Sequence, residues 1–256
     1  MLALACIAVL VACGWTYLGL VLAGQNSQGF LRALCEPLYG ATGSSGVAAS
    51  LLTLAMWCAM VLAMMLPSAG PMIATYADLA ETAIAKGEPA ASPLVLATGY
   101  IVVWLGAALA LTALQALLAR FGALDSTIAV ANPFIAGAMF LAAGLYQFSA
   151  AKHACLTHCQ HPFRFFFGNW TSVSRGVFRI GLRQGLYCLG CCWAMMLLML
   201  AVGAMSVVWM ALLGAVMTVE KLGTSMRFSR VAGVVFLAIG LVIIVNSLVP
   251  GWPRAG

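Results

Sequence analysis

Residues 94–119 read LVLATGYIVVWLGAALALTALQALLA and include no charged side chain. A helix of about 20 mainly apolar residues is long enough to cross the hydrocarbon core of a bilayer. The stretch is followed directly by Arg120, a charged residue at the expected end of the span. We therefore interpret residues 94–119 as a transmembrane helix, and this interpretation decides the fold class.

The composition of the whole chain supports the same class. Of the 256 residues, 64% are hydrophobic and 7% are charged, whereas a soluble domain carries about 25% charged residues. Long apolar runs exclude a β-barrel, whose short strands alternate polar and apolar positions. Helices are then the only way to satisfy backbone polar groups in lipid. We predict an all-α polytopic transmembrane helical bundle that forms a single integral membrane domain over residues 1–256.

The apolar runs predict about seven spans, with six as the alternative count. Pro67 and Pro71 are expected to end or kink the second span. The following stretch, Met72–Lys86, has an apolar and a polar face and predicts an amphipathic helix at the membrane interface. A basic connector is expected over 163–184, and a tight hairpin at Gly203. The spans lie at about 1–23, 47–66, 94–119, 132–150, 186–202, 205–219 and 230–249.

The net charge of +6 is interpreted as a sign of orientation, with no nucleic acid expected as a partner. Basic residues gather in cytoplasmic loops. With a cytoplasmic N-terminus, the outside holds only Arg32, Arg120 and Arg254 of the twelve basic residues, leaving nine inside. This predicts that the stretch 153–161 described below lies at the cytoplasmic face, where thiols stay reduced.

All three histidines lie within residues 153–161, together with Cys155 and Cys159. On a continuous helix Cys155, His158 and Cys159 occupy positions i, i+3 and i+4 and share a face. His161 follows at the next i+3, while His153 lies on the opposite side. Two sulfurs with one or two imidazoles suit Zn²⁺ or Cu(I), so this cluster predicts a metal site.

A second cluster, Cys188, Cys191 and Cys192, opens the fifth predicted span. A thiol costs less to bury than a carboxylate or an amine at the centre of a bilayer. Methionine stripes on the second and fifth spans are typical of a helix core, but thioethers also bind Cu(I). We therefore add Met64, Met65 and Met196 to the candidate ligands. Glu220 and Lys221 are interpreted as an ordinary charged helix end, with a carboxylate that anchors the site or a partner as the alternative.

The chain resembles the bacterial predicted metal-binding integral membrane proteins, a domain family of unknown function sometimes labelled copper chaperone. The resemblance covers spans two to seven. It implies metal binding with copper favoured, and it places the chain in a bacterial inner membrane. Ser206 departs from the asparagine of the pattern, and His153 and His161 lie outside it. The matching motifs are W57-x-x-M60 with A63–P67, Y146-Q147 with K152-x-x-C155-L156-x-H158-C159-x-x-P162, G185–A194, G203-x-M205 and E220-K221.

Three functions remain open at this point. The first is Cu(I) handling, by delivery to a membrane metalloenzyme or by transport, with zinc as the alternative metal. The second is a membrane thiol–disulfide carrier that uses cysteine pairs. The third is an accessory or assembly subunit of a larger membrane complex. No Ser/His/Asp constellation is present, so we expect no enzymatic activity apart from the thiol redox alternative.

Overall fold

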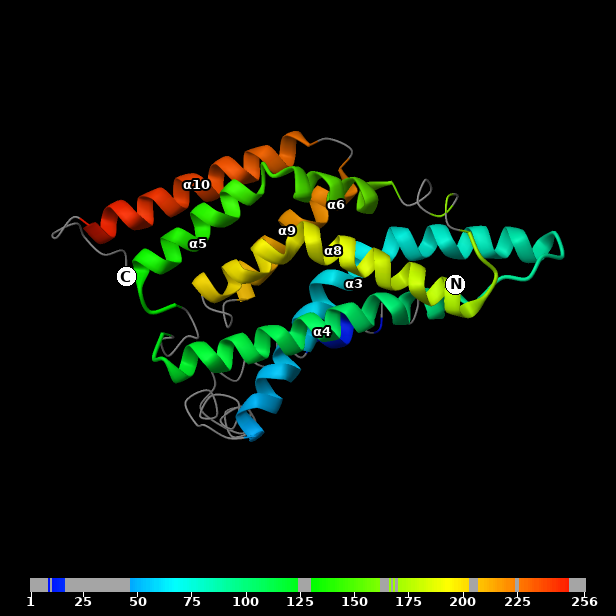
Figure 1. Cartoon of the computed structure of the whole chain (residues 1–256), viewed down its shortest axis with the longest axis horizontal. Coiled ribbons are helices and arrows are strands. Elements are labelled where there is room, and N and C mark those ends of the chain that lie inside the picture. Colours follow the sequence, from blue (N-terminus) through cyan, green and yellow to red (C-terminus); the bar gives the residue numbers. More distant parts are fainter. Residues whose placement is uncertain are drawn as a thin grey trace.

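The computed structural model describes residues 9, 11–16, 47–123, 130–161, 166, 168, 170–202, 207–223 and 226–248. Regular structure in these ranges is helical, which confirms the all-α class. Figure 1 shows the helices and their labels. They are α3 (Val47–Ala85), α4 (Pro93–Arg120), α5 (Pro133–Tyr146), α6 (Ala150–Gln160), α8 (Ser174–Val202), α9 (Val207–Leu222) and α10 (Arg227–Leu248).

Four helices, α3, α4, α8 and α10, are long and apolar enough to cross a membrane. The pair α5 and α6 could form a fifth crossing, with a bend of 64° between the two helices. Helix α9 has 16 residues, which is short for a span. The predicted count of about seven spans is therefore not confirmed. Most of the predicted span 1–23 and the hairpin at Gly203 lie outside the described residues.

Of the two outcomes expected at Pro67 and Pro71, an end of the helix is wrong, because α3 continues through both residues, and the kink is the alternative that remains. A proline cannot donate to the carbonyl four residues earlier. For Pro67 this carbonyl belongs to Ala63, and it accepts the indole N–H of Trp15 at 3.1 Å instead. Figure 1 shows the two halves of α3 running in different directions. The tertiary contact thus supplies the partner that the proline removed.

The stretch expected to form a separate interfacial helix, 72–86, is the second half of α3. Its apolar face packs into the protein, since Met72, Ile73 and Tyr76 are buried. The phenol of Tyr76 donates to the carbonyl of Ala91 at 3.1 Å. The stretch is amphipathic as expected, but its apolar face packs against the protein core and not against a membrane interface.

The predicted fourth span, 132–150, is divided by a bend. Helix α5 ends at Tyr146, and Ser149 caps the N-terminus of α6 by accepting the amide N–H of Lys152 at 3.1 Å. A serine at this position stabilises a new helix start because it satisfies a backbone donor. The stretch 153–161 therefore lies almost wholly on α6, a helix of its own.

Helix α8 begins at Ser174, twelve residues before the predicted start at 186. Arg175, Arg179 and Arg183 recur every fourth residue and are exposed, while Val177 and Ile180 on the other face are buried. The expected basic connector is therefore helical from Ser174 onward. Its arginines form the polar side of an amphipathic helix.

Helices α4 and α8 approach closely because glycines face each other. A Cβ at Gly99 would collide with the carbonyl oxygen of Phe178, and one at Gly181 with that of Leu96. Small residues let helix backbones pack at short range where lipid offers no hydrophobic drive. This contact fixes α8 beside α4.

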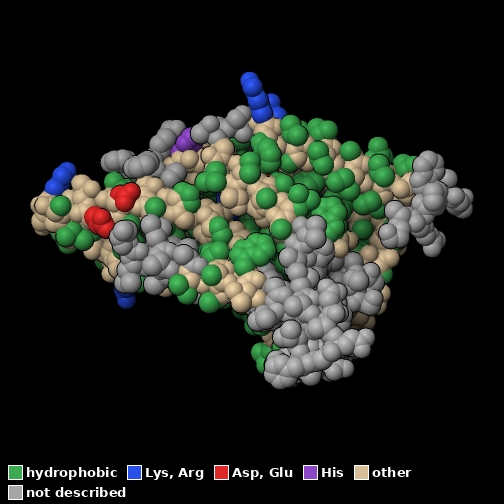
Figure 2. Space-filling view, turned by 180° about the vertical axis from the view of Figure 1, so that it is seen from behind, with side chains coloured by type: hydrophobic (Ala, Val, Ile, Leu, Met, Phe, Trp, Pro, Cys, Tyr) green, Lys and Arg blue, Asp and Glu red, His purple; other side chains and the backbone are tan. Residues whose placement is uncertain are grey.

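The outer surface is strongly apolar. Figure 2 shows hydrophobic side chains over much of one face and few charged ones. Helix α10 exposes Val234, Val235, Leu241 and Val242, and α4 exposes Leu105 and Leu109. Exposed apolar surface on this scale is unusual for a soluble monomer.

Candidate metal centre

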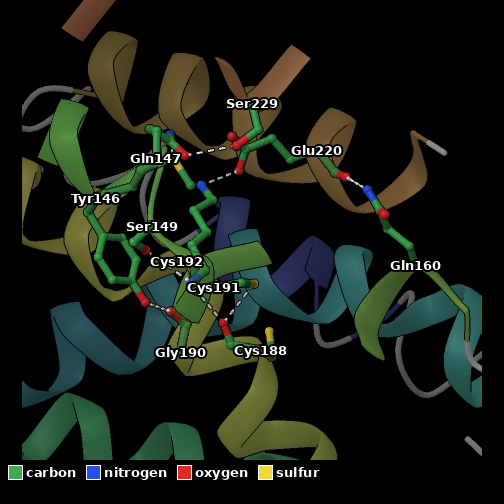
Figure 3. A network of polar contacts seen from close by, with 12 residues as sticks. Tyr146, Gln147, Ser149, Gln160, Cys188, Gly190, Cys191, Cys192, Glu220 and Ser229 are labelled. Atoms are coloured by element: carbon green, nitrogen blue, oxygen red, sulfur yellow. Dashed lines mark hydrogen bonds and ion pairs between the residues drawn. The ribbon is translucent and has the colours of Figure 1, made fainter. Parts of the chain in front are cut away.

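The three cysteines of α8 lie on one buried face of that helix. Cys188, Cys191 and Cys192 are 3%, 2% and 1% exposed. The thiols of Cys191 and Cys192 donate to the backbone carbonyl of Cys188 at 3.1 and 2.9 Å (Figure 3). The thiol of Cys188 has different partners, and it forms the centre of the site.

Two polar side chains from other helices meet the Cys188 sulfur. The hydroxyl of Tyr100 on α4 lies 2.9 Å from it, and the ammonium of Lys221 on α9 lies 3.0 Å away. Lys221 also donates to the hydroxyl of Ser68 at 2.9 Å and to the thioether of Met65 at 3.8 Å. An ammonium in contact with a sulfur can balance the charge of a thiolate, the form of cysteine that binds metals.

Helix α6 brings its two cysteines to the same region. The thiol of Cys159 lies beside those of Cys188 and Cys191. The sulfur of Cys155 packs against Gly190, where an added Cβ would be only 2.7 Å from it. Tyr146 holds this segment by donating its hydroxyl to the carbonyl of Gly190 (Figure 3). The two cysteine clusters, 29 residues apart between Cys159 and Cys188, therefore form one site.

A cavity of about 160 Å³ opens beside Cys159 and Cys188. The carbonyl oxygen of the Gln184 side chain is buried next to it, without a hydrogen-bond partner among the described residues. Sulfur, hydroxyl, amide and ammonium groups thus face one small space. Its lining residues are Ser68, Ala69, Pro71, Met72, Tyr100, Cys159, Gln160, Gln184, Cys188, Lys221 and Leu222.

A buried ion pair fixes α6 against α9 behind this cavity. The ammonium of Lys152 lies 2.8 Å from a carboxylate oxygen of Glu220, and the side chains are 1% and 2% exposed. The side-chain amide of Gln160 donates to the backbone carbonyl of Glu220 at 2.8 Å (Figure 3). Cys159 precedes Gln160 in the chain, and Lys221 follows Glu220. These contacts therefore hold Cys159 and Lys221 close to each other.

The histidines are not gathered around the thiols. The imidazole of His158 stacks on Tyr187, with ring centroids 4.2 Å apart, and its Nδ1 lies 2.8 Å from the carbonyl of Ala154. His161 is exposed at the C-cap of α6. Their predicted role as ligands stays a prediction.

Of the candidate methionines, only Met65 contacts the site, through Lys221 and through its carbonyl, which accepts from Tyr100 at 3.2 Å. Met64 packs on α9, with its methyl carbon 3.1 Å from a Cβ added at Gly214. Met196 is buried in the core. Across the described residues, no three His, Cys, Asp or Glu side chains are arranged to hold a metal ion. Cys159 and Cys188 line the same cavity, and the thioether of Met65 contacts the ammonium that also contacts Cys188.

Sequence reasoning missed five polar residues of the cavity: Ser68, Tyr100, Gln160, Gln184 and Lys221. It treated Glu220 and Lys221 as an ordinary helix end, and this is wrong because they are only 3% and 6% exposed. The only sequence signal for a role in the site was that this charged pair directly follows an apolar run. The pattern alone does not tell a solvated helix end from a buried one.

Comparison with known proteins places this geometry in a family context. The family model PpoB2, described as a copper chaperone, matches residues 54–243. The match includes every cysteine and polar residue of the cavity. No curated protein and no solved structure matches the chain.

Proposed function

We propose a function from the premise that the chain belongs to the copper chaperone family, whose model matches residues 54–243. In this proposal the protein is embedded in a membrane and handles Cu(I) as cargo. Cys159 and Cys188 bind the ion, assisted by Met65, and the protein then delivers it to a membrane metalloenzyme. Transport across the membrane is the alternative form of the same role.

One observation carries the proposal: sulfur atoms from α3, α6 and α8 converge beside one cavity. Cys188, Cys159 and Met72 line it directly, and the thioether of Met65 lies 3.8 Å from the ammonium of Lys221, which also lines it. Thiolates and thioethers are the soft ligands that select Cu(I). A thioether is not among the usual ligands of zinc, which takes cysteine, histidine and carboxylates. The donor set therefore favours copper over the alternative metal.

The helices support the membrane part of the proposal. Four are long and apolar enough to span, and α10 presents valine and leucine side chains on its outside. In a bilayer these side chains would contact lipid. We retain the bacterial inner membrane, a cytoplasmic N-terminus and a cytoplasmic position of α6 as proposals from charge and resemblance.

The direct test is metal analysis of the detergent-purified chain after Cu(I) loading under reducing conditions. We expect the wild type to retain copper with sulfur ligands in X-ray absorption. Cys188→Ser and Cys159→Ser should lose most of it. Cys58→Ser is the matched control, because Cys58 lies on α3 away from the cavity. A wild type that retains no copper, or a Cys188→Ser variant that retains as much, would refute the proposal.

The thiol–disulfide carrier remains a second candidate because one observation favours it. The ammonium of Lys221, 3.0 Å from Cys188 Sγ, would also suit a reactive thiolate. Thiol trapping under oxidising and reducing conditions separates the two. A reversible disulfide between Cys188 and another cysteine, in a chain that retains no metal, would favour the carrier.

A further inference from the structure

We propose that Lys221 is a specificity-determining residue that makes the cavity take a monovalent metal ion in preference to a divalent one. The inference rests on the proposed function, since it concerns the same two thiols. Sulfur ligands already favour soft metal ions. The inference adds that the site also selects among metal ions by their charge. It also assigns a role to a residue that is not itself a ligand.

The ammonium of Lys221 is held in place. An ammonium has three N–H donors, and three acceptors surround this one: Cys188 Sγ at 3.0 Å, Ser68 Oγ at 2.9 Å and Met65 Sδ at 3.8 Å. The side chain is 6% exposed. If the ammonium moved away from this position, it would lose all three contacts. Lys221 is therefore a fixed positive charge next to the sulfur that binds the metal.

None of the described residues that line the cavity carries a carboxylate to offset this charge. Glu220, the next residue on α9, pairs with Lys152 at 2.8 Å instead. The thiols of Cys191 and Cys192 donate to the backbone carbonyl of Cys188, and neither residue lines the cavity. Among the described residues that line the cavity, the thiols of Cys159 and Cys188 and the ammonium of Lys221 are thus the groups that carry charge when metal is bound.

The sum of charges then depends on the metal. When a metal binds, each ligating thiol releases its proton to solvent. Two thiolates, one ammonium and a monovalent ion sum to zero, whereas a divalent ion leaves one uncompensated positive charge. A net charge is costly among groups as buried as Cys188 and Lys221, which are 3% and 6% exposed. The geometry therefore favours Cu(I) or Ag(I) over Zn²⁺ or Cd²⁺.

The test compares affinities of the full detergent-purified chain for Ag(I), a redox-stable monovalent probe, and for Cd²⁺, by competition titration under reducing conditions. We expect the wild type to prefer Ag(I). Lys221→Gln removes the charge and should shift the affinity ratio toward Cd²⁺ by on the order of tenfold or more. Lys221→Arg should keep the preference. Lys86→Gln, at an exposed lysine, is the matched control and should not change the ratio.

A second variant covers the case in which Lys221→Gln does not fold. Ser68→Asp places a carboxylate beside the ammonium, at a half-buried position, and should shift the ratio in the same direction. If the wild type binds Ag(I) but its affinity for Cd²⁺ is equal or higher, the inference is overturned and the proposed function is left intact. Unchanged ratios in the folded Lys221→Gln or Ser68→Asp variants would do the same. Failure of the wild type to bind Ag(I) or Cu(I) would instead refute the proposed function.

Discussion

Removal of Lys152 should destabilise the protein far more than removal of a surface lysine. Its ammonium lies 2.8 Å from Glu220, with both side chains almost fully buried. At an effective dielectric constant of about 20, unit charges at this distance attract by about 6 kcal/mol. The cost of desolvating both groups reduces the net value of the pair. Breaking such a pair from one side, however, leaves a buried carboxylate uncompensated and costs about 3–5 kcal/mol.

The perturbation is Lys152→Met, which keeps the length of the side chain. For a chain of this size we expect the melting temperature to fall by about 6–20 °C. The assay is thermal unfolding of the purified protein in detergent, followed by loss of the monodisperse peak. Lys86→Met at an exposed lysine is the control, and it should change the melting temperature by less than about 2 °C.

The double variant Lys152→Met/Glu220→Gln distinguishes charge from packing. It removes both charges, so most of the lost stability should return. The reasoning would be refuted if Lys152→Met melted like the wild type. It would also be refuted if the double variant were as unstable as the single one, because the loss would then come from packing.

Two further substitutions test contacts around the site and in the core. Gly190→Ala places a Cβ 2.7 Å from the sulfur of Cys155 and should cost about 1–3 kcal/mol in thermal unfolding. Gly106→Ala, which meets no atom within 4 Å, should be neutral or slightly stabilising, and equal effects of the two would contradict the proposed contact. Gln115→Leu removes the acceptor of the buried Trp57 indole N–H, now at 2.9 Å, and should cost about 1–3 kcal/mol. The same change in a Trp57→Phe background should cost less, and an equal cost would show that the hydrogen bond is not responsible.

Helical class and several helix ends could be predicted from the sequence. The predicted span 94–119 corresponds to α4 at Pro93–Arg120, and 230–249 to α10 at Arg227–Leu248. Uncharged apolar runs bounded by charged or turn residues are a local signal, and a helix satisfies its own backbone whatever surrounds it. These elements therefore needed no knowledge of their neighbours.

The path of α3 could not be predicted in this way. Pro67 is a local signal for a helix end, but the indole of Trp15 satisfies the carbonyl that the proline leaves without a partner. Burial of Ile73 and Tyr76 stabilises the continuation. Both effects come from residues distant in the sequence, and they outweigh the local preference.

The same division applies to the site. By itself, the sequence determined which residues share a helix face, because Cys155 and Cys159, or Cys188 and Cys192, are four residues apart. Only the tertiary structure decided that these faces meet, and that Lys221 lies 3.0 Å from Cys188. Side-chain spacing along one helix follows from its period of 3.6 residues. Contacts between helices, and the burial of a charge among them, depend instead on how all the helices pack together.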